Sequence, residues 1–383
     1  AHATHPDAGM ALALAAAQID AQRAQIDAHA RPAFAPTLGW VYFTDVLAPQ
    51  AEALWAELTQ RWPGVAWVGG VGVGLLATGV EYLDEPALAL MLTDLPADQF
   101  SLFDGRRPLG SGTAHFTAQV HVDPTVPDVA ELIAELAERT DSGYLFGGLV
   151  SSRGRTVHLA DQLHQGGLSG VAFGPEVLLR SRVTQGSQPV GPSRRITACD
   201  GNVVMTLDGQ AALPLLLGDL GLSLERPQQA LQGLRRTLVG LTDGVADSPV
   251  RPGQFGAETR VRHLIGIDPG REAIAIADVP EPGQHLAFCR RDAEAARRDL
   301  IRICAELREE AEGHDQRIAG ALYISCSGRG GPHFGGPSAE ARIVQHALGE
   351  VPLVGFFAAG EVARDQLYGY TGVLTVFVGA SRD

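Results

Sequence analysis

The sequence predicts an α+β fold, in which two related halves have mixed or antiparallel sheets covered by helices and could form one continuous sandwich. Short apolar runs separated by Gly and Pro are typical of strands. Stretches with helical periodicity lie between these runs, and the same succession recurs in the second half of the 383 residues. Because hairpin spacings outnumber those of βαβ crossovers, we expect mixed or antiparallel sheets.

The length of 383 residues predicts more than one hydrophobic core. We divide the chain into an N-terminal helix at 1–36, a domain at 37–238 and a domain at 239–383. The stretch 242–256 is rich in Gly, Pro and Asp, so we expect a boundary or inter-domain loop there.

In the first half, an Ala-rich helix is expected to end before Pro32, and Asp123-Pro124 is a start signal for a later helix. From residue 144 on, short apolar runs predict an antiparallel meander. The expected helices are 10–30, 50–62, 126–139, 210–217 and 228–234, and the expected strands are 38–44, 65–76, 87–93, 114–122, 144–152, 156–160, 168–173, 177–184, 195–198 and 203–207.

The second half begins with three short apolar runs and continues with a long charged helix. A strand then leads into a glycine-rich loop at 326–336, which a further helix follows. The expected strands are 261–267, 273–277, 285–289, 318–325, 353–357 and 373–378, and the expected helices are 292–312 and 338–348.

Composition excludes several classes of function. The formal charge of −14 repels phosphate backbones, so no nucleic-acid partner is expected. No apolar run reaches the ~20 residues of a membrane span, so no membrane partner is expected either. The four cysteines are widely spaced and form no C-x-x-C pair, which favours a reducing, cytoplasmic location. Lysine is absent, which excludes a P-loop lysine or a Schiff base.

Motif searches exclude further chemistries. There is no G-x-S-x-G elbow and no Cys/His cluster with zinc spacing, so no metal site is predicted. The run Gly69-Gly70-Val71-Gly72-Val73-Gly74 fails the dinucleotide spacing because Leu75 takes the last position. We expect no cofactor. Haem is the alternative, since a single histidine can hold it; the candidates are His115, His121, His158, His164, His263, His285, His333 and His346.

The glycine-rich loop carries the densest chemical signal. It reads Ser325-Cys326-Ser327-Gly328-Arg329-Gly330-Gly331-Pro332-His333-Phe334-Gly335-Gly336, between a strand and a helix. Loop amides at a helix start can bind an anion, and Arg329 can hold a carboxylate. Cys326 could act as a nucleophile, but a free cysteine is more often buried and inert. We therefore assign no catalytic residue and keep Cys326 as the alternative.

Two more segments contribute candidate ligand-binding residues. Phe356 and Phe357 occupy one strand and must point to opposite faces, so only one of them can line a given cavity. Glu361 follows at the strand end, where its carboxylate could receive an amine or pair with an arginine. The bent loop 184–192 offers Gln185 and Gly191. The predicted ligand-binding set is Gln185, Gly191, Cys326, Arg329, Gly330, Phe334, Phe357 and Glu361.

Taken in order, these blocks resemble the FIST family (F-box and intracellular signal transduction proteins) over nearly the full chain. The resemblance is carried by Gly147-Gly148-Leu149, Gln185-Gly186 with Pro189-Val190-Gly191, Gly201-Asn202, Ile265-Gly266-Ile267-Asp268-Pro269, Arg291-Asp292-Ala293, the Ser325–Gly335 block and Gly355-Phe356-Phe357 with Gly360-Glu361. Two departures stand out. Ser187 replaces an expected cysteine, and Ala358-Ala359 replaces a more polar pair.

The resemblance implies a bacterial, stand-alone sensory protein that binds a small polar molecule such as an amino acid. It further implies signalling through a separate partner, a histidine kinase or a cyclic-dinucleotide enzyme. A haem-binding nitric-oxide sensor and an enzyme using Cys326 are the alternatives, and an adaptor is a fourth reading. For the leading hypothesis we expect a pocket between the halves, and Arg329→Ala is expected to abolish binding with little loss of stability.

Overall fold

The computed structural model describes residues 1–29, 33–110, 114–243 and 259–380. The chain forms two compact units. One unit comprises Ala1–Thr184 together with Leu300–Asp383, and the other comprises Gln185–Asp299. Most of the predicted boundary stretch, from 244 to 256, lies outside the described residues. The predicted division of the chain at 238/239 stays a prediction.

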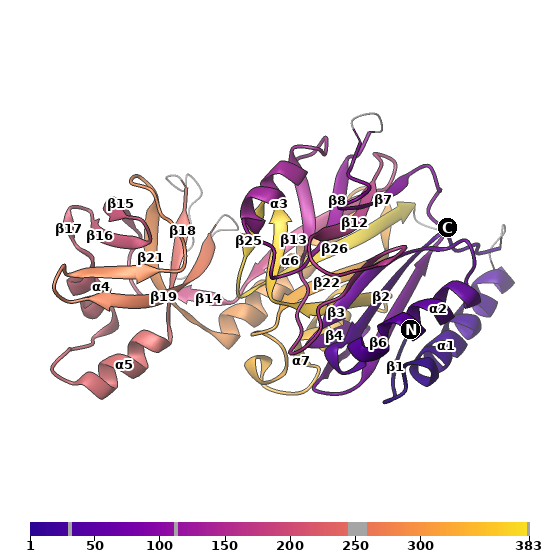
Figure 1. Cartoon of the computed structure of the whole chain (residues 1–383), viewed down its shortest axis with the longest axis horizontal. Helices are drawn as coiled ribbons and strands as arrows, with labels where there is room; N and C mark the ends of the chain where they lie inside the picture. The colour runs from indigo at the N-terminus through magenta and orange to yellow at the C-terminus, as the bar shows by residue number, and fades with distance from the viewer. Residues whose placement is uncertain (30–32, 111–113, 244–258, 381–383) are drawn as a thin grey trace. The chain divides into compact units, whose positions relative to one another are not determined.

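The larger unit contains three six-stranded sheets (Figure 1). The first has the order β1-β6-β2-β3-β10-β11, the second β7-β12-β8-β9-β24-β25 and the third β13-β26-β22-β23-β4-β5. The strands are β1 His2–Thr4, β2 Leu38–Thr44, β3 Ala66–Gly72, β4 Gly74–Ala77, β5 Val80–Leu83, β6 Ala87–Thr93, β7 Phe100–Asp104, β8 Thr117–Val122, β9 Tyr144–Leu149, β10 His158–Ala160, β11 Leu163–His164, β12 Leu168–Phe173, β13 Leu179–Gln185, β22 Gln316–Cys326, β23 Leu353–Ala358, β24 Gly360–Arg364, β25 Gln366–Tyr368 and β26 Thr371–Ala380.

The three sheets are built from three copies of one unit of topology. In each copy a strand is joined by a helical crossover to a parallel neighbour: β2 to β3, β8 to β9 and β22 to β23. The chain next forms a hairpin in another sheet, and then returns to pair antiparallel with the first strand as β6, β12 or β26. The hairpin β4–β5 of the first copy joins the third sheet, β10–β11 of the second copy joins the first sheet, and β24–β25 of the third copy joins the second sheet. Each copy thus gives its hairpin to another copy's sheet, and the three transfers close into a ring. We call these copies the first, second and third repeat.

A glycine occupies the same place in every parallel pair. Gly69, Gly147 and Gly355 lie opposite residues of β2, β8 and β22 respectively. A Cβ atom on any of them would lie 1.7 to 1.9 Å from the carbonyl oxygen of that partner. Only glycine allows the two backbones to approach this closely. The rejected dinucleotide pattern around Gly69 is therefore a packing feature of the repeat.

The inner faces of the three sheets share one apolar core, which includes Trp40, Phe146 and Phe356. Helices cover the outer faces (Figure 1). Helices α1 (Ala8–His29) and α2 (Ala51–Arg61, preceded by the 3-10 turn η1, Asp45–Gln50) pack on the first sheet. Helix α3 (Val129–Ala137) packs on the second sheet, and α7 (Ala339–Leu348) contacts β5 of the third.

The smaller unit is a closed antiparallel barrel. Strands β15, β16, β20, β19, β18 and β21 pair in a ring, and β14 and β17 add to its ends. Apolar residues such as Ile196, Ile274 and Phe288 fill the barrel core together with α4. The elements are β14 Ser187–Pro189, β15 Arg194–Asp200, β16 Val203–Leu207, β17 Gln210–Ala211, α4 Ala212–Leu220, α5 Pro227–Arg235, β18 Thr237–Thr242, β19 Arg260–Asp268, β20 Ala273–Ile276, β21 His285–Arg291 and α6 Ala293–Glu312, whose later part belongs to the larger unit.

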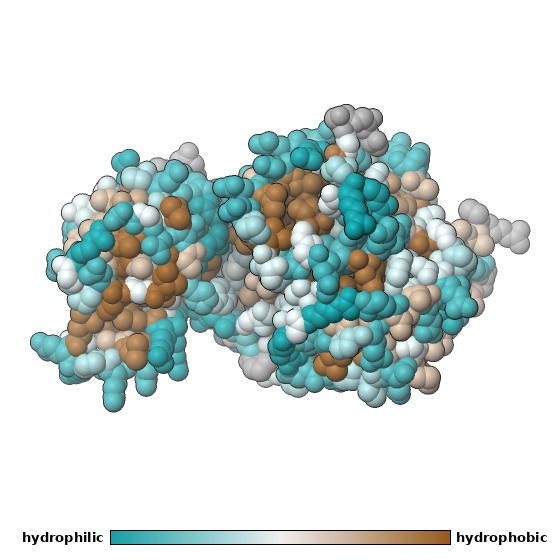
Figure 2. All heavy atoms as spheres, viewed as in Figure 1, coloured by the Kyte–Doolittle hydropathy of each residue, from teal (hydrophilic) through white to brown (hydrophobic). Residues whose placement is uncertain are grey.

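The α+β class with mixed sheets is confirmed. The predicted antiparallel meander from residue 144 is wrong, because β9, β10, β12 and β13 lie in the second, first, second and third sheets. Strand patterns report which side of a strand is buried, but they do not identify the neighbouring strand. Figure 2 shows apolar side chains on the barrel around α5 and β19, where Leu231 and Ile265 are exposed.

Candidate functional site

A buried polar cluster lies where the parallel strands β22 and β23 end, in the larger unit. Ligands of α/β sheets often bind at this end of parallel strands. The cluster centres on Arg329 in the loop after β22 and on Glu340 in the first turn of α7. Both side chains are fully buried.

Glu340 gathers three donors with one carboxylate oxygen. Its Oε1 accepts hydrogen bonds from Tyr323 Oη at 2.6 Å, Ser325 Oγ at 2.9 Å and Arg329 Nε at 3.1 Å. Its other oxygen, Oε2, is buried and has no hydrogen-bond partner among the described residues. A buried carboxylate oxygen without a partner is costly, so this atom calls for a bound water or a ligand.

Arg329 is held from several sides. Its guanidinium lies 5.2 Å from the centre of the Phe334 ring, a cation–π distance. Its Nη1 donates long hydrogen bonds to the carbonyls of Thr184, at 3.4 Å, and Tyr370, at 3.5 Å. Its Nη2 is buried and finds no partner in the described part of the chain. Burial acts to lower the pKa of Arg329, but negative neighbours, Glu340 among them, outweigh it and the guanidinium stays charged.

Glu361 and Cys326 extend the cluster. Glu361 Oε2 accepts from the Thr371 amide at 3.1 Å and the Thr371 hydroxyl at 2.7 Å, whereas its buried Oε1 has no partner within the described residues. Burial raises the pKa of Glu361 to about 8, and Thr371, Arg329 and Cys326 offset only part of this effect. Burial also raises the pKa of Cys326 to about 12. A thiol with this pKa is neutral near pH 7, which argues against a thiolate nucleophile.

Glu81 supports the loop from the β4–β5 hairpin. Its carboxylate accepts from the amides of Gly331, at 2.9 Å, and Ala341, at 3.0 Å. The second of these amides belongs to the first turn of α7, where a negative side chain is favoured. Gly330 lets the loop pass the Phe357 ring, since a Cβ there would lie 2.6 Å from a ring carbon.

The first and second repeats show which residues occupy the places that correspond to Tyr323 and Ser325 of β22. In register with the paired glycines, Tyr323 corresponds to Val41 and Val120, and Ser325 two residues later corresponds to Phe43 and Val122. Those four residues pack in apolar cores beneath α2 and α3. The third repeat therefore has polar residues at a place where the same architecture is otherwise apolar. Stability alone does not require that polarity.

Most of the predicted ligand-binding residues are in this cluster. The structure brings together Cys326, Arg329, Gly330, Phe334, Phe357 and Glu361. Phe356 and Phe357 lie on opposite faces of β23, with Phe356 in the shared core and Phe357 against the loop. Arg329 pairs with Glu340, a carboxylate outside the predicted ligand-binding set.

Gln185 and Gly191 belong to the smaller unit. Gln185 Nε2 donates to the Thr259 carbonyl at 2.8 Å, and its buried Oε1 has no partner among the residues described. Gly191 lies against Asp219, which pairs with Arg194 at 2.6 Å. The predicted pocket between the halves stays a prediction, although the cluster takes Glu81 and Thr184 from the first half of the sequence.

Sequence reasoning missed several members of the cluster. Tyr323 and Ser325 alternate within an otherwise apolar buried strand, and this spacing places both on one face. That signal was available from the sequence. Glu81 gave no such signal, because it reaches the loop from a hairpin that lies far away along the chain. Thr371, at the start of β26, gave none either.

Two of the histidines named as haem candidates, His121 and His158, make hydrogen bonds inside the larger unit. The ring of His121 packs beside Tyr42 and Phe356 in the core and its Nε2 bonds Tyr42 Oη at 2.9 Å. Both ring nitrogens of His158 are taken, by Ser169 Oγ at 2.6 Å and the Gly166 carbonyl at 3.0 Å. Haem binding stays an alternative prediction. Among the described residues, no group of three His, Cys, Asp or Glu is placed to hold a metal ion.

The raised pKa of Glu361 predicts how stability depends on pH. Its pKa is about 8 in the folded chain and about 4.5 in the unfolded chain, so the folded state binds more protons between these values. The contribution of Glu361 to the free energy of unfolding should then fall as pH rises from 5 to 8, by up to about 1.4 kcal/mol per pH unit, whereas the buried His121 and His158, whose pKa values burial lowers, contribute in the opposite sense. Glu361→Gln cannot ionise and should remove this decline.

Urea denaturation at several pH values measures this effect. All four tryptophans (Trp40, Trp55, Trp62 and Trp67) lie in the larger unit, so their fluorescence reports the unit that contains Glu361. Glu350→Gln, a change at an exposed glutamate, is the control. An equal pH dependence in the wild type and in Glu361→Gln would contradict the raised pKa.

Known proteins resemble this chain over most of its length. The FIST N domain matches residues 37–210, and the FIST C domain matches residues 212–364. The chain is 34% identical to the uncharacterised protein Rv0628c of Mycobacterium tuberculosis, over 93% of this chain and 95% of that protein. It is 31% identical to the uncharacterised protein Mb0898c of Mycobacterium bovis, over 98% and 97%.

FIST domains are associated with sensory signal transduction and small-ligand binding. In the described part of the chain, no helix is long and apolar enough to cross a membrane. Both domain models match in order and together cover well over half of the sequence. The chain therefore belongs to the FIST family and carries both its N-terminal and its C-terminal domain.

Proposed function

We propose that this chain is a sensory protein whose buried polar cluster binds a small polar molecule and which signals through a separate partner protein. The observation that carries the proposal is the set of buried polar atoms without partners among the described residues: Arg329 Nη2, Glu340 Oε2 and Glu361 Oε1. Each would lose free energy on leaving water unless another molecule hydrogen-bonds to it. A ligand with matching groups supplies that bond.

The chemistry of these atoms favours a zwitterion such as an amino acid. Arg329 Nη2 requires an acceptor, which a carboxylate provides with a charge-assisted bond. The free oxygen of Glu340, and that of Glu361 once its carboxyl has lost its proton, accept from a donor, which an ammonium group provides. Cys326, Phe334 and Phe357 would supply the less polar surroundings. A histidine kinase or a cyclic-dinucleotide enzyme in the cytoplasm is the proposed partner.

Calorimetric titration with the twenty common amino acids tests this proposal. Compounds that lack either the carboxylate or the amine are the matched ligand controls. At pH 9, where the Glu361 carboxyl is ionised, Glu361→Gln keeps the side-chain shape and should weaken binding about 10- to 100-fold, as expected for a lost charged hydrogen bond. Glu350→Gln, at an exposed position, should bind as the wild type does. Equal affinity in the wild type and Glu361→Gln would remove Glu361 from the site.

A further inference from the structure

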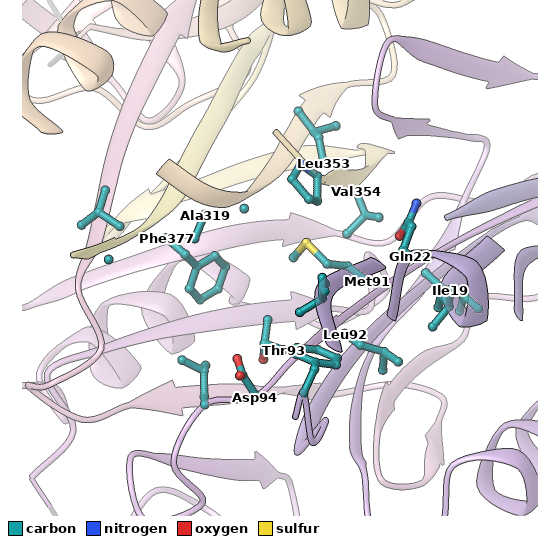
Figure 3. Close-up of a pocket in the computed structure, with 18 of the residues that line it drawn as sticks. Ile19, Gln22, Met91, Leu92, Thr93, Asp94, Ala319, Leu353, Val354 and Phe377 are labelled. Atoms are coloured by element: carbon teal, nitrogen blue, oxygen red, sulfur yellow. The ribbon is translucent and has the colours of Figure 1, made fainter. Parts of the chain in front are cut away.

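A second cavity lies at the other end of the same parallel strands. It has a volume of about 520 Å³ and lies entirely in the larger unit. Figure 3 shows side chains from α1, β6, β22, β23 and β26 around it. Ala319 and Leu353 line it near the starts of β22 and β23, whereas Ser325, Cys326 and Arg329 lie at or beyond the end of β22. The cavity is therefore separate from the polar cluster.

The floor of the cavity is apolar. Met91, Val354 and Phe377 are buried, and their side chains belong to the shared core of the three sheets. A cavity of this volume with mostly apolar walls and a few polar groups is typical of small-molecule sites. The floor therefore suits a hydrocarbon body.

Comparison of the repeats explains why there is space here. Gly320 lies three residues before Tyr323 in β22. The corresponding residues are Leu38 in the first repeat and Thr117 in the second. Leu38 fills the core with its side chain, whereas Gly320 leaves that volume open. A Cβ on Gly320 would meet its nearest neighbours, Met91 Sδ and the Pro352 carbonyl, at 3.5 and 3.8 Å. Close backbone packing therefore does not require glycine here.

The rim of the cavity carries charges of both signs. Arg23 and Arg317 lie there with Asp94 and Glu176. Arg23 is distinguished by its Nε, which is buried and has no hydrogen-bond partner among the residues described. Its Nη2 makes a long bond of 3.4 Å to the Phe34 carbonyl. The open donor of Arg23 requires an acceptor, and an anionic head group suits the positive charge.

We propose that this cavity binds an anionic amphiphile, a molecule with a hydrocarbon chain and a carboxylate head. The hydrocarbon chain of the ligand lies on the floor formed by Met91, Val354 and Phe377, and its carboxylate accepts a hydrogen bond from Arg23. This site is independent of the proposed amino-acid site, so either can fail without the other.

Calorimetric titration with decanoate tests the proposal, with decanol and decylamine as probes of the head group. The wild type should bind decanoate more tightly than decylamine. Gly320→Leu should fill the cavity and abolish decanoate binding while the midpoint of thermal unfolding stays unchanged or rises. Arg23→Gln should weaken decanoate binding about 10-fold, the loss expected for one charge-assisted bond, and leave decanol binding unchanged.

Gly320→Ala, which needs only ordinary contacts, serves if the leucine variant does not fold. It should weaken decanoate binding without loss of thermal stability. No binding of decanoate by the wild type would overturn the proposal, and so would wild-type affinity in both Gly320 variants. Equal affinity for decanoate and decylamine would overturn the assignment of an anionic head group.

Discussion

Replacing Arg329 by methionine is expected to lower the free energy of unfolding of the larger unit by about 3–5 kcal/mol. The substitution leaves the fully buried carboxylate of Glu340 without its positive partner. This expectation revises the one drawn from the sequence, in which Arg329→Ala was to cost little stability. The sequence placed Arg329 in a glycine-rich loop, and such loops are commonly exposed.

A double-mutant cycle separates the ion pair from the rest of the site. In Arg329→Met with Glu340→Leu, both charges are gone and part of the stability should return, because two apolar groups bury without a charge penalty, whereas the buried hydroxyls of Tyr323 and Ser325 lose their acceptor. Urea denaturation followed by tryptophan fluorescence measures all four members of the cycle. Additive losses in the double variant would show that the two side chains do not depend on each other.

Replacing Gly355 by alanine is expected to lower the free energy of unfolding by more than about 4 kcal/mol, an exceptional loss for one added methyl group. The new Cβ would lie 1.7 Å from the Tyr323 carbonyl oxygen, so β22 and β23 would have to separate. Alanine at Gly69 or Gly147 should have a similar effect, since the clash recurs at 1.8 and 1.9 Å and both glycines have positive φ.

Gly336→Ala is the matched control for these substitutions. No atom lies within 4 Å of a Cβ at Gly336, and its φ is not positive. The control should change the free energy of unfolding by less than about 0.5 kcal/mol. Circular dichroism and urea denaturation compare the four variants. A loss of less than about 1 kcal/mol at any of the three paired glycines would contradict the close approach of the strands in that repeat.

The sequence predicted most of the longer helices and strands, because periodicity reports burial directly. It did not predict β5, β24 or β25, which are short hairpin strands that cross from one repeat to a neighbouring sheet. The ring-like exchange of hairpins depends on pairing between distant segments. A pattern of apolar residues carries no information on that pairing, so the threefold repeat became visible only in the structure.

The candidate site shows a similar division. The loop with Arg329 and Gly330, and the later Glu361, stood out because arginine, glycine and carboxylate are unusual next to apolar strands. Glu340 follows that loop in the sequence, but its role as the acceptor for Tyr323 and Ser325 could not be predicted. That role depends on how α7 packs over β22. Whether Gln185 and Gly191 take part in binding stays a prediction.

Native mass spectrometry of the wild type and Glu361→Gln tests the central claim most directly. Both proteins would be incubated with the amino-acid panel, and each spectrum compared with that of the denatured chain. We predict one bound amino acid per wild-type chain, lost on denaturation and strongly reduced in Glu361→Gln. A wild-type chain that binds none of the panel, or a variant that retains the same bound mass, would contradict the account. The open atoms of Arg329, Glu340 and Glu361 would then be assigned to buried water.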